Sequence, residues 1–283
     1  MKGYISGATG FLGRMLASHF VDKNCSLTLA GRDVRNLEEL RSELLGLAVD
    51  PNLTIDIHAI DFSQPAHISQ QLERLNAETF DWCINAVGVQ GTVGSELDLT
   101  YVDYQENLNV NLLSPIEFTR WFSKQFLRVN TGRIIHFSGG GSSNVRPYFS
   151  PYAISKTALA RFVENTAFEL QSYNIQLFSI APGLMPSKML GDSLSRPEYL
   201  QKSQIEVIES ALNKYSNFDG EKILNLVDFL LSGTADAFSG KMVSAQWDNW
   251  SEWPNHSDEI KNSDLYTLRR ITGRDRGQDW GDL

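Results

Sequence analysis

Short apolar runs alternate with longer segments of helical period along most of this 283-residue chain. Strands are predicted over residues 3–6, 26–30, 53–60, 82–86, 133–138, 175–180 and 241–245. Helices are predicted over residues 11–23, 34–47, 68–78, 101–129, 152–172 and 221–231. Because the apolar runs are nearly continuous, they predict a parallel sheet that helices cover on both faces. The predicted fold class is α/β, a doubly wound Rossmann-type sheet of seven parallel strands.

The helix predicted over residues 152–172 carries an apolar stripe that we expect to pack on the sheet. The stripe consists of Ile154, Leu159, Phe162, Val163 and Phe168. Ser150 is expected to cap this helix, and Pro151 suits its first turn.

The composition is that of an ordinary globular protein, with 42% hydrophobic and 21% charged residues. A formal net charge of −9 argues against nucleic acid or an anionic membrane as a partner. No apolar run approaches the roughly 20 residues that span a bilayer. Because the first predicted strand begins at residue 3, no signal peptide is expected. Cys25 and Cys83 lie in apolar runs, and the five histidines show no ligand spacing, so no metal site is predicted. We expect a cytoplasmic protein.

A glycine-rich turn joins the first predicted strand to the first predicted helix. It reads Ser-Gly-Ala-Thr-Gly-Phe-Leu-Gly from Ser6 to Gly13. Gly7, Gly10 and Gly13 would allow a tight turn, close approach of backbone to a pyrophosphate, and close packing of helix on sheet. The free N–H groups of the helix N-terminus suit the phosphates. The turn therefore predicts a dinucleotide site that includes Thr9, Phe11 and Leu12; a tight turn without a ligand is the alternative.

Residues that follow the next three strands add to this site. Arg32 stands where an acidic residue would bond the adenosine ribose of NAD, and it could pair with a 2′-phosphate instead. This favours NADP(H), while the neighbouring Asp33 keeps NAD(H) as an alternative; Arg32 could also be a solvated loop charge. The further candidates are Asp61 and Phe62, which could lie along the adenine, and Asn85, Ala86 and Gly88, where backbone could approach the cofactor.

Tyr152 and Lys156 stand four residues apart, which places both side chains on one face of a helix. There the ammonium group could lower the pKa of the phenol by favouring the phenolate. Such a phenol can exchange a proton with a substrate oxygen while a hydride moves to or from carbon. The pair alone also fits a solvated helix face.

These motifs, in this order, resemble the short-chain dehydrogenase/reductase family from Lys2 to about Ala245. The resemblance implies that Tyr152 is the catalytic acid/base and that Lys156 holds the nicotinamide ribose. It also implies that the backbone of Asn111 supports a water relay. Asn85 to Gly88 is similar to the family's Asn-Asn-Ala-Gly stretch. Pro182, Gly183 and Ser187 are similar to the segment that holds the nicotinamide end.

One departure from the family concerns the serine that bonds the substrate oxygen. An ungapped alignment on Tyr152 places Gly139 at that position, within the run Ser138-Gly-Gly-Gly-Ser142. Ser138 would face the other way on a strand, but the glycines allow backbone bends that could turn it into the site. Ser142 is a second candidate, and backbone N–H groups of the glycines are a third. The run could also simply make room for a bulky substrate.

The resemblance divides the chain into a domain over residues 1–246, with a substrate lid at about 184–218, and a C-terminal extension over residues 247–283. The extension carries Trp247, Trp250, Trp253 and Trp280, and we expect it to pack on the domain or on a partner subunit. It also carries Arg269, Arg270, Arg274 and Arg276, which could grip a phosphorylated or nucleotide-linked sugar. The alternative is a structural strap that pairs Asp264, Asp275 and Asp279.

The expected activity is an NAD(P)(H)-dependent interconversion of a secondary alcohol and a ketone. Two alternatives remain from the sequence: a sugar-nucleotide epimerase or dehydratase that uses NAD, and a non-catalytic NAD(P)-sensing binding protein. The resemblance further implies a homodimer or homotetramer, paired through the helices that contain Asn111 and Tyr152.

Overall fold

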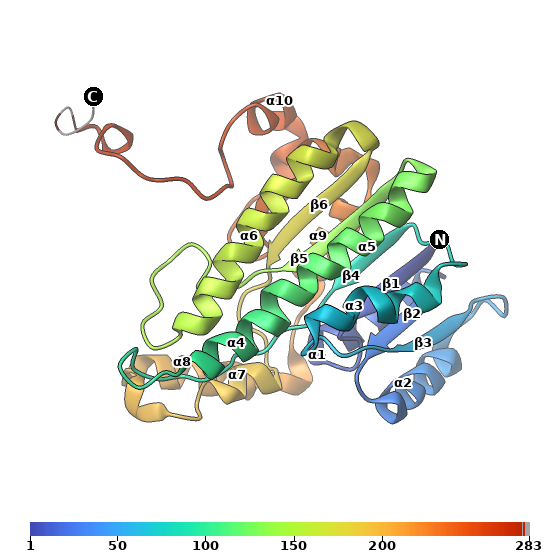
Figure 1. The fold of residues 1–283 in the computed structure, drawn as a ribbon, viewed down its shortest axis with the longest axis horizontal. Helices are drawn as coiled ribbons and strands as arrows, with labels where there is room; N and C mark the ends of the chain where they lie inside the picture. Colours follow the sequence, from blue (N-terminus) through green and yellow to red (C-terminus); the bar gives the residue numbers. More distant parts are fainter. Residues whose placement is uncertain (279, 281–283) are drawn as a thin grey trace.

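The computed structural model describes residues 1–278 and 280. A seven-stranded sheet with the order β3-β2-β1-β4-β5-β6-β7 forms its centre (Figure 1). Every neighbouring pair of strands is parallel, so the predicted seven-stranded parallel sheet is confirmed. The strands are β1 Lys2–Ser6, β2 Ser26–Gly31, β3 Ile55–Ala59, β4 Trp82–Asn85, β5 Gly132–Phe137, β6 Ile175–Ala181 and β7 Met242–Ser244.

Helices cover both faces of the sheet, as predicted. One face carries α1 Phe11–Asp22, α2 Val34–Leu47 and α9 Glu221–Leu231. The other face carries α3 Pro65–Leu72, α5 Ser114–Val129 and α6 Ser150–Leu170, with α4 Tyr101–Leu108 packed on α6. Figure 1 shows α4, α5 and α6 running along this second face.

Two of the predicted helices are less regular than the sequence suggested. The helix predicted over residues 101–129 is interrupted by a π-helical turn, Asn109–Leu113, between α4 and α5. The helix predicted over residues 68–78 ends as α3 and continues as the 3₁₀ turn Glu73–Leu75. The prediction that Ser150 caps α6 was wrong, because Ser150 is already helical and Phe149 precedes the first turn.

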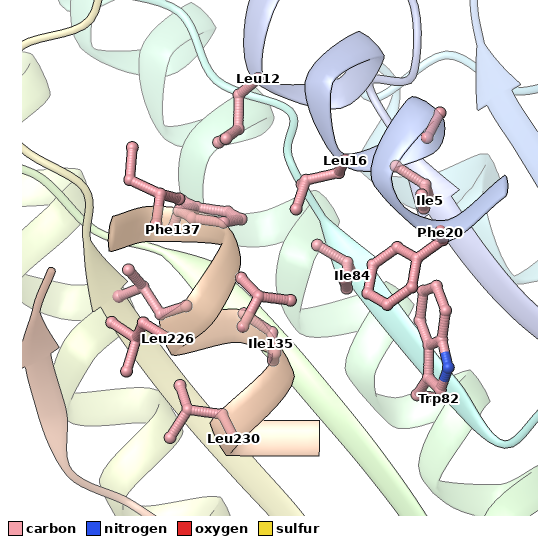
Figure 2. Close-up of a cluster of buried hydrophobic side chains, with 14 of the residues drawn as sticks. Ile5, Leu12, Leu16, Phe20, Trp82, Ile84, Ile135, Phe137, Leu226 and Leu230 are labelled. Atoms are coloured by element: carbon pink, nitrogen blue, oxygen red, sulfur yellow. The ribbon is translucent and has the colours of Figure 1, made fainter. Parts of the chain in front are cut away.

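The core on the α1 and α9 face is one apolar cluster to which helices and strands both contribute. Figure 2 shows how these side chains meet between the two helices and the sheet. The labelled members are Leu12, Leu16, Phe20, Leu226, Leu230, Ile5, Trp82, Ile84, Ile135 and Phe137. Because β1, β4 and β5 are covered on both faces, their apolar runs are nearly continuous.

The expected stripe of α6 packs on the sheet only in part. Leu159 and Val163 are buried, but Ile154 is 49% exposed and Phe168 is 75% exposed. These two side chains lie 14 residues apart, about four turns, so they share the outer face of the helix. The hydrophobicity of the stripe therefore does not by itself identify its buried side.

The lid region contains two helices, α7 Lys188–Asp192 and α8 Lys202–Leu212. Its end is joined to the glycine turn by aromatic contacts, because the ring of Phe11 lies 5.2 Å from that of Tyr215 and 5.4 Å from that of Phe218. The end of this predicted lid is therefore in contact with the start of α1.

The C-terminal extension docks through two of its four tryptophans. Trp253 is buried, Trp250 stacks on Phe229 at 5.6 Å, and Trp247 and Trp280 are exposed. A short helix, α10 Ser257–Lys261, follows. Figure 1 shows the chain then leaving the body beside α6 and α10, away from α7 and α8.

One arginine of this extension, Arg269, contacts an acidic group of the domain. The Arg269 guanidinium donates to the Glu164 carboxylate of α6 at 2.7 Å and lies 3.8 Å from Asp264, while Arg161 donates to the Leu268 carbonyl. Asp275 accepts from Thr272, and Asp279 lies outside the described residues. Arg269 is therefore paired with acidic groups of the chain itself, which is the kind of contact that the strap alternative predicts. Within the part of the chain that is described, no helix is long and apolar enough to cross a membrane.

Tyr4 anchors the opposite core through a buried hydrogen bond. Its hydroxyl lies 2.8 Å from Nδ1 of His58, whose Nε2 lies 3.1 Å from the Gln71 carbonyl. Because a carbonyl only accepts, Nε2 carries the proton and Nδ1 accepts from Tyr4. Burial lowers the pKa of His58, which keeps the ring neutral.

The change Tyr4→Phe should lower the free energy of unfolding by about 1–2 kcal/mol, because it leaves a buried acceptor without a donor. Urea unfolding measures the difference, with the exposed Tyr101→Phe as the matched control. Equal stability of the two variants would contradict the assignment of this hydrogen bond.

Candidate active site

The predicted site residues follow different strands but meet at one edge of the sheet. Carboxyl ends of parallel strands lie along the same edge, so the segments after β1, β2, β3, β4, β5 and β6 open on a common side. Those segments carry, in order, the glycine turn, Arg32, Asp61, Asn85 to Gly88, Ser138, and Pro182 to Ser187.

The glycine turn has backbone geometry that side chains would block. Gly7 has φ +70°, and a Cβ on it would lie 2.9 Å from the Ala86 backbone. A Cβ on Gly13 would lie 2.1 Å from the Gly7 carbonyl oxygen, so α1 packs closely on the turn. Gly10 donates its N–H to that carbonyl at 3.0 Å. The turn is thus closed tightly over the start of α1, as a phosphate cradle requires.

The charged candidates after β2 and β3 differ in whether their side chains already have hydrogen-bond partners. Arg32 is exposed and has no partner among the described residues. The carboxylate of Asp33 caps α2 by accepting from the Asn36 N–H at 3.1 Å. Asp61 accepts from the backbone and hydroxyl of Ser63, and the ring of Phe62 is buried in the core. Arg32 is therefore the free charged group at this end.

Tyr152 and Lys156 are both buried, in the first two turns of α6. The Lys156 Nζ donates to the Phe137 carbonyl at 2.8 Å and lies 5.9 Å from the centre of the Tyr152 ring. Burial lowers the pKa of Lys156 to about 8. Burial also raises the pKa of Tyr152, and the charge that opposes this rise is that of Arg146. The expected lowering of the phenol's pKa by Lys156 is not what the structure shows.

Asn111 lies in the π-helical turn and faces the loop after β4. Its Oδ1 accepts from the Val89 N–H at 3.0 Å, and its Nδ2 donates to the Val89 carbonyl at 2.9 Å. A Cβ on Gly88 would lie 3.5 Å from Lys156 Nζ and 3.6 Å from Asn111 Oδ1. Gly88 therefore keeps the backbone close to both groups. Single π-helical turns of this kind occur frequently at functional sites.

The three candidates for the serine role, Ser138, Ser142 and the backbone at Gly139, differ in their surroundings. A Cβ on Gly139 would lie 2.2 Å from the Tyr152 hydroxyl, so no side chain fits there with the tyrosine in this place. The Ser138 Oγ is buried and has no hydrogen-bond partner. The Ser142 hydroxyl already donates to the Gly139 carbonyl at 2.7 Å. Ser138 therefore has the free hydroxyl of the two.

A glycine with positive φ and a serine that caps α7 determine the backbone of the segment after β6. Gly183 has φ +87°, and a Cβ on it would lie 2.7 Å from Cγ of Gln246. The Ser187 hydroxyl accepts from the Leu190 N–H at 3.2 Å and so caps α7. Met189 of α7 comes close to Gly88, with its Sδ 3.9 Å from where a Cβ would be. Pro182 thus begins a link from the sheet to the lid.

A buried polar chain supports the loop after β4. Asn85 Oδ1 accepts from the Ser6 hydroxyl at 2.7 Å and from the Val87 N–H at 3.2 Å, so its Nδ2 donates to His136 Nδ1 at 3.3 Å. His136 Nε2 then donates to the Thr119 hydroxyl at 2.8 Å. Burial lowers the pKa of His136 to about 3, and the charge of Lys156 acts in the same direction. These hydrogen bonds fix the positions of β1, β4, β5 and α5 relative to one another.

Sequence reasoning missed four residues that the structure brings to this edge: Arg14, Gln90, His136 and Arg146. Arg14 follows the third glycine and donates to the Thr9 carbonyl at 3.3 Å, so its position was a signal. The other three lie in loops or on a strand with no local pattern. Among the described residues no cluster of three histidine, cysteine or acidic side chains could hold a metal ion.

A Rossmann-type sheet, a glycine turn after β1, and a Tyr-Lys pair beside the loop after β4 define a nucleotide-binding oxidoreductase. The chain matches the short chain dehydrogenase family over residues 4–198, which is more than half of its length. It belongs to this family, whose members bind NAD(P) and small-molecule substrates and are usually oligomers.

Individual relatives agree with this assignment. Human dehydrogenase/reductase SDR family member 4 is 24% identical over 247 residues, which cover 84% of each chain. The uncharacterized oxidoreductase YvrD of Bacillus subtilis is 25% identical, over 83% of this chain and 91% of the relative. The solved structure of a putative NAD(P)-dependent gluconate 5-dehydrogenase from Beutenbergia cavernae, with bound NADP, superposes with a TM-score of 0.74 at 19% identity. It covers 86% of this chain and 94% of that protein.

The neutral His136 predicts a specific acid sensitivity. Its pKa is lower in the folded than in the unfolded protein, so its contribution to stability is complete above about pH 6.5 and is lost as the pH falls toward about 3. One pH unit below 6.5 the loss should be about 1.4 kcal/mol. His136→Asn should remove this part of the pH dependence of the free energy of unfolding, whereas His67→Asn, at an exposed position, should not. If the free energy of unfolding of His136→Asn falls with pH as steeply as that of the wild-type protein, the prediction is wrong.

Proposed function

We propose that this chain is an NADP(H)-dependent oxidoreductase that interconverts a secondary alcohol and a ketone by hydride transfer. The observation that carries the proposal is that Lys156 and Asn111 meet at Gly88 while the Tyr152 hydroxyl lies against Gly139, and the Lys156 Nζ is 5.9 Å from the Tyr152 ring centre. Membership of the short chain dehydrogenase family supports it.

The residues of the nucleotide end fit a dinucleotide. Gly7 and Gly13 let the turn pack against the Ala86 backbone and onto α1, where a Cβ would clash, and the start of α1 offers N–H groups for the pyrophosphate. Arg32 is free to pair with a 2′-phosphate, whereas the carboxylate of Asp33 is engaged as a cap. The other expected contacts come from Thr9, Phe11, Leu12 and Gly10, from Ala86 and Gly88, and from Pro182, Gly183 and Ser187.

The chemistry at carbon needs the bound nicotinamide to supply or accept the hydride. Tyr152 exchanges the proton with the substrate oxygen, because its phenol is the buried acid/base nearest Gly139. Lys156 is held beside Gly88 and suits the nicotinamide ribose, and Asn111 supports a water relay. The free hydroxyl of Ser138 would orient the substrate oxygen.

The other activities considered from the sequence find less support. Most of the relatives are named as dehydrogenases, reductases or oxidoreductases, which favours redox turnover over an epimerase, a dehydratase or a non-catalytic sensor. A grip on a nucleotide-linked or phosphorylated sugar was one of two roles considered for the tail arginines, but Arg269 is occupied by Glu164 on α6. We therefore leave the sugar out of the proposal.

A homodimer or homotetramer is part of the proposal. Ile154 and Phe168 expose apolar surface on the outer face of α6, and Leu113 exposes more between α4 and α5. Burial of these side chains against a second copy would stabilise the assembly, since apolar surface gains roughly 25 cal/mol per Å² when it leaves water.

Arg32→Ala should weaken NADPH binding by about tenfold or more and leave NADH binding nearly unchanged, because only NADPH carries the 2′-phosphate. Titration of tryptophan fluorescence measures both affinities. Arg35→Ala, which removes an exposed arginine paired with Glu39 on α2, is the matched control. Equal loss for both cofactors would mean that Arg32 does not read the phosphate.

Tyr152→Phe should reduce kcat by about 10²–10⁴-fold with cofactor binding retained, because the proton donor is removed and the ring stays. Turnover is followed by NADPH absorbance, and the exposed Tyr173→Phe serves as the control. Near-normal turnover by Tyr152→Phe would exclude this mechanism.

A further inference from the structure

Arg146 lies in the loop between β5 and α6, six residues before Tyr152. Its guanidinium carbon is 3.9 Å from the centre of the Phe149 ring and 5.2 Å from the centre of the Tyr152 ring. The side chain is partly buried, and desolvation lowers the pKa of its guanidinium. A cation is therefore held against the proposed acid/base, with ring faces as its contacts.

This cation lacks an acidic partner. Of the other arginines near the body of the domain, Arg133 pairs with Asp236 and Arg161 pairs with Glu164. No carboxylate among the described residues lies within ion-pair distance of Arg146, in a chain with 34 acidic and 25 basic residues. The planar group has five N–H donors, and stacking on a ring uses none of them. A desolvated charge without a counter-ion is costly, so a structural role alone explains it poorly.

The loop that carries Arg146 is fixed in a strained conformation. Tyr148 has φ +68°, which is unfavourable for a bulky residue and is found where other contacts over-determine the backbone. Its carbonyl accepts from the Gly94 N–H at 2.9 Å, and its ring lies 5.1 Å from that of Tyr199 in the lid. Phe149 beside it is buried. The strain is thus compensated by contacts that keep Arg146 next to Tyr152.

A second polar group without a partner lies in the neighbouring loop. Gln90 is only 4% exposed, and its Nε2 has no hydrogen-bond partner. Its Oε1 accepts from the Ser193 hydroxyl of the lid at 3.1 Å, so the amide is oriented with its donors unused. Gln90 is two residues beyond Gly88, which adjoins Lys156 and Asn111.

We propose that the substrate carries a carboxylate close to its reacting carbonyl, that Arg146 binds this carboxylate through two parallel hydrogen bonds, and that the Gln90 amide is a further donor to it. The inference deepens and rests on the proposed function. A single guanidinium matches the charge and planar geometry of one carboxylate, whereas a phosphate dianion would call for more cations. The substrate class is thus a 2-oxo or 3-oxo carboxylate and the corresponding hydroxy acid.

The reaction balances with the groups already named. In reduction, a hydride from NADPH forms the new C–H bond at the carbonyl carbon, and Tyr152 gives a proton to the oxygen. The oxo acid becomes a hydroxy acid, NADPH becomes NADP⁺, and the proton of Tyr152 is restored from solvent. The carboxylate takes no part in bond changes, so Arg146 determines specificity and orientation.

The test compares each of several 2-oxo and 3-oxo carboxylates with its methyl ester, using the full-length protein and NADPH. Wild-type protein should favour the acid in kcat/KM, and Arg146→Met should lower kcat/KM for the acid by about 100-fold with a small effect on the ester. Arg146→Lys keeps the charge but not the paired donors, so its kcat/KM for the acid should lie between those of the wild-type protein and Arg146→Met. Arg35→Met is the control for loss of an exposed guanidinium.

Binding is measured separately, as the thermal shift that each acid and ester produces in the presence of NADP⁺. An acid-dependent shift that disappears in Arg146→Met supports the inference even without turnover, and that result would count against the proposed function alone. Equal treatment of acid and ester by the wild-type protein, or equal losses for both in Arg146→Met, overturns it. Preference for dihydroxyacetone phosphate over every oxo acid would overturn the carboxylate assignment.

Discussion

Parallel hydrogen bonding of seven strands is the constraint on which the rest of this protein depends. Because every strand points the same way, the segments that follow six of them meet at a single edge. The glycine turn, Arg32 and Gly88 therefore lie along the same edge, and α6 brings Tyr152 to it. Apolar packing of α1 and α9 on one face and of α5 and α6 on the other holds the sheet in place.

Within this sheet, hydrogen bonds between buried polar side chains fix neighbouring strands relative to one another. The chain of hydrogen bonds through Ser6, Asn85, His136 and Thr119 is buried and directional. It fixes the loop that leads to Gly88, while burial and the charge of Lys156 lower the pKa of His136 and keep its ring neutral. A buried network of this kind is favourable only when each member is satisfied, which ties the shape of the site to the core below it.

Sequence reasoning recovered the strands to within two residues at each end, because continuous apolar runs with β-branched residues are a local signal. It also placed Tyr152 and Lys156 on one helix. It was wrong about which apolar residues of α6 are buried, since Ile154 and Phe168 face outward. It also assigned to Lys156 an effect on the phenol that in the structure comes from Arg146, a residue in a loop without periodicity.

The sequence by itself determined the α/β alternation, the glycine turn and the four-residue spacing of the Tyr-Lys pair, because each depends on neighbours along the chain. Only the tertiary structure decided that Ser142 is occupied by the Gly139 carbonyl, that Ser138 and Gln90 have unused donors, and that Arg146 has no carboxylate partner. Burial and the distance between charges depend on segments far apart in sequence. These properties appear only after the chain has folded around its sheet.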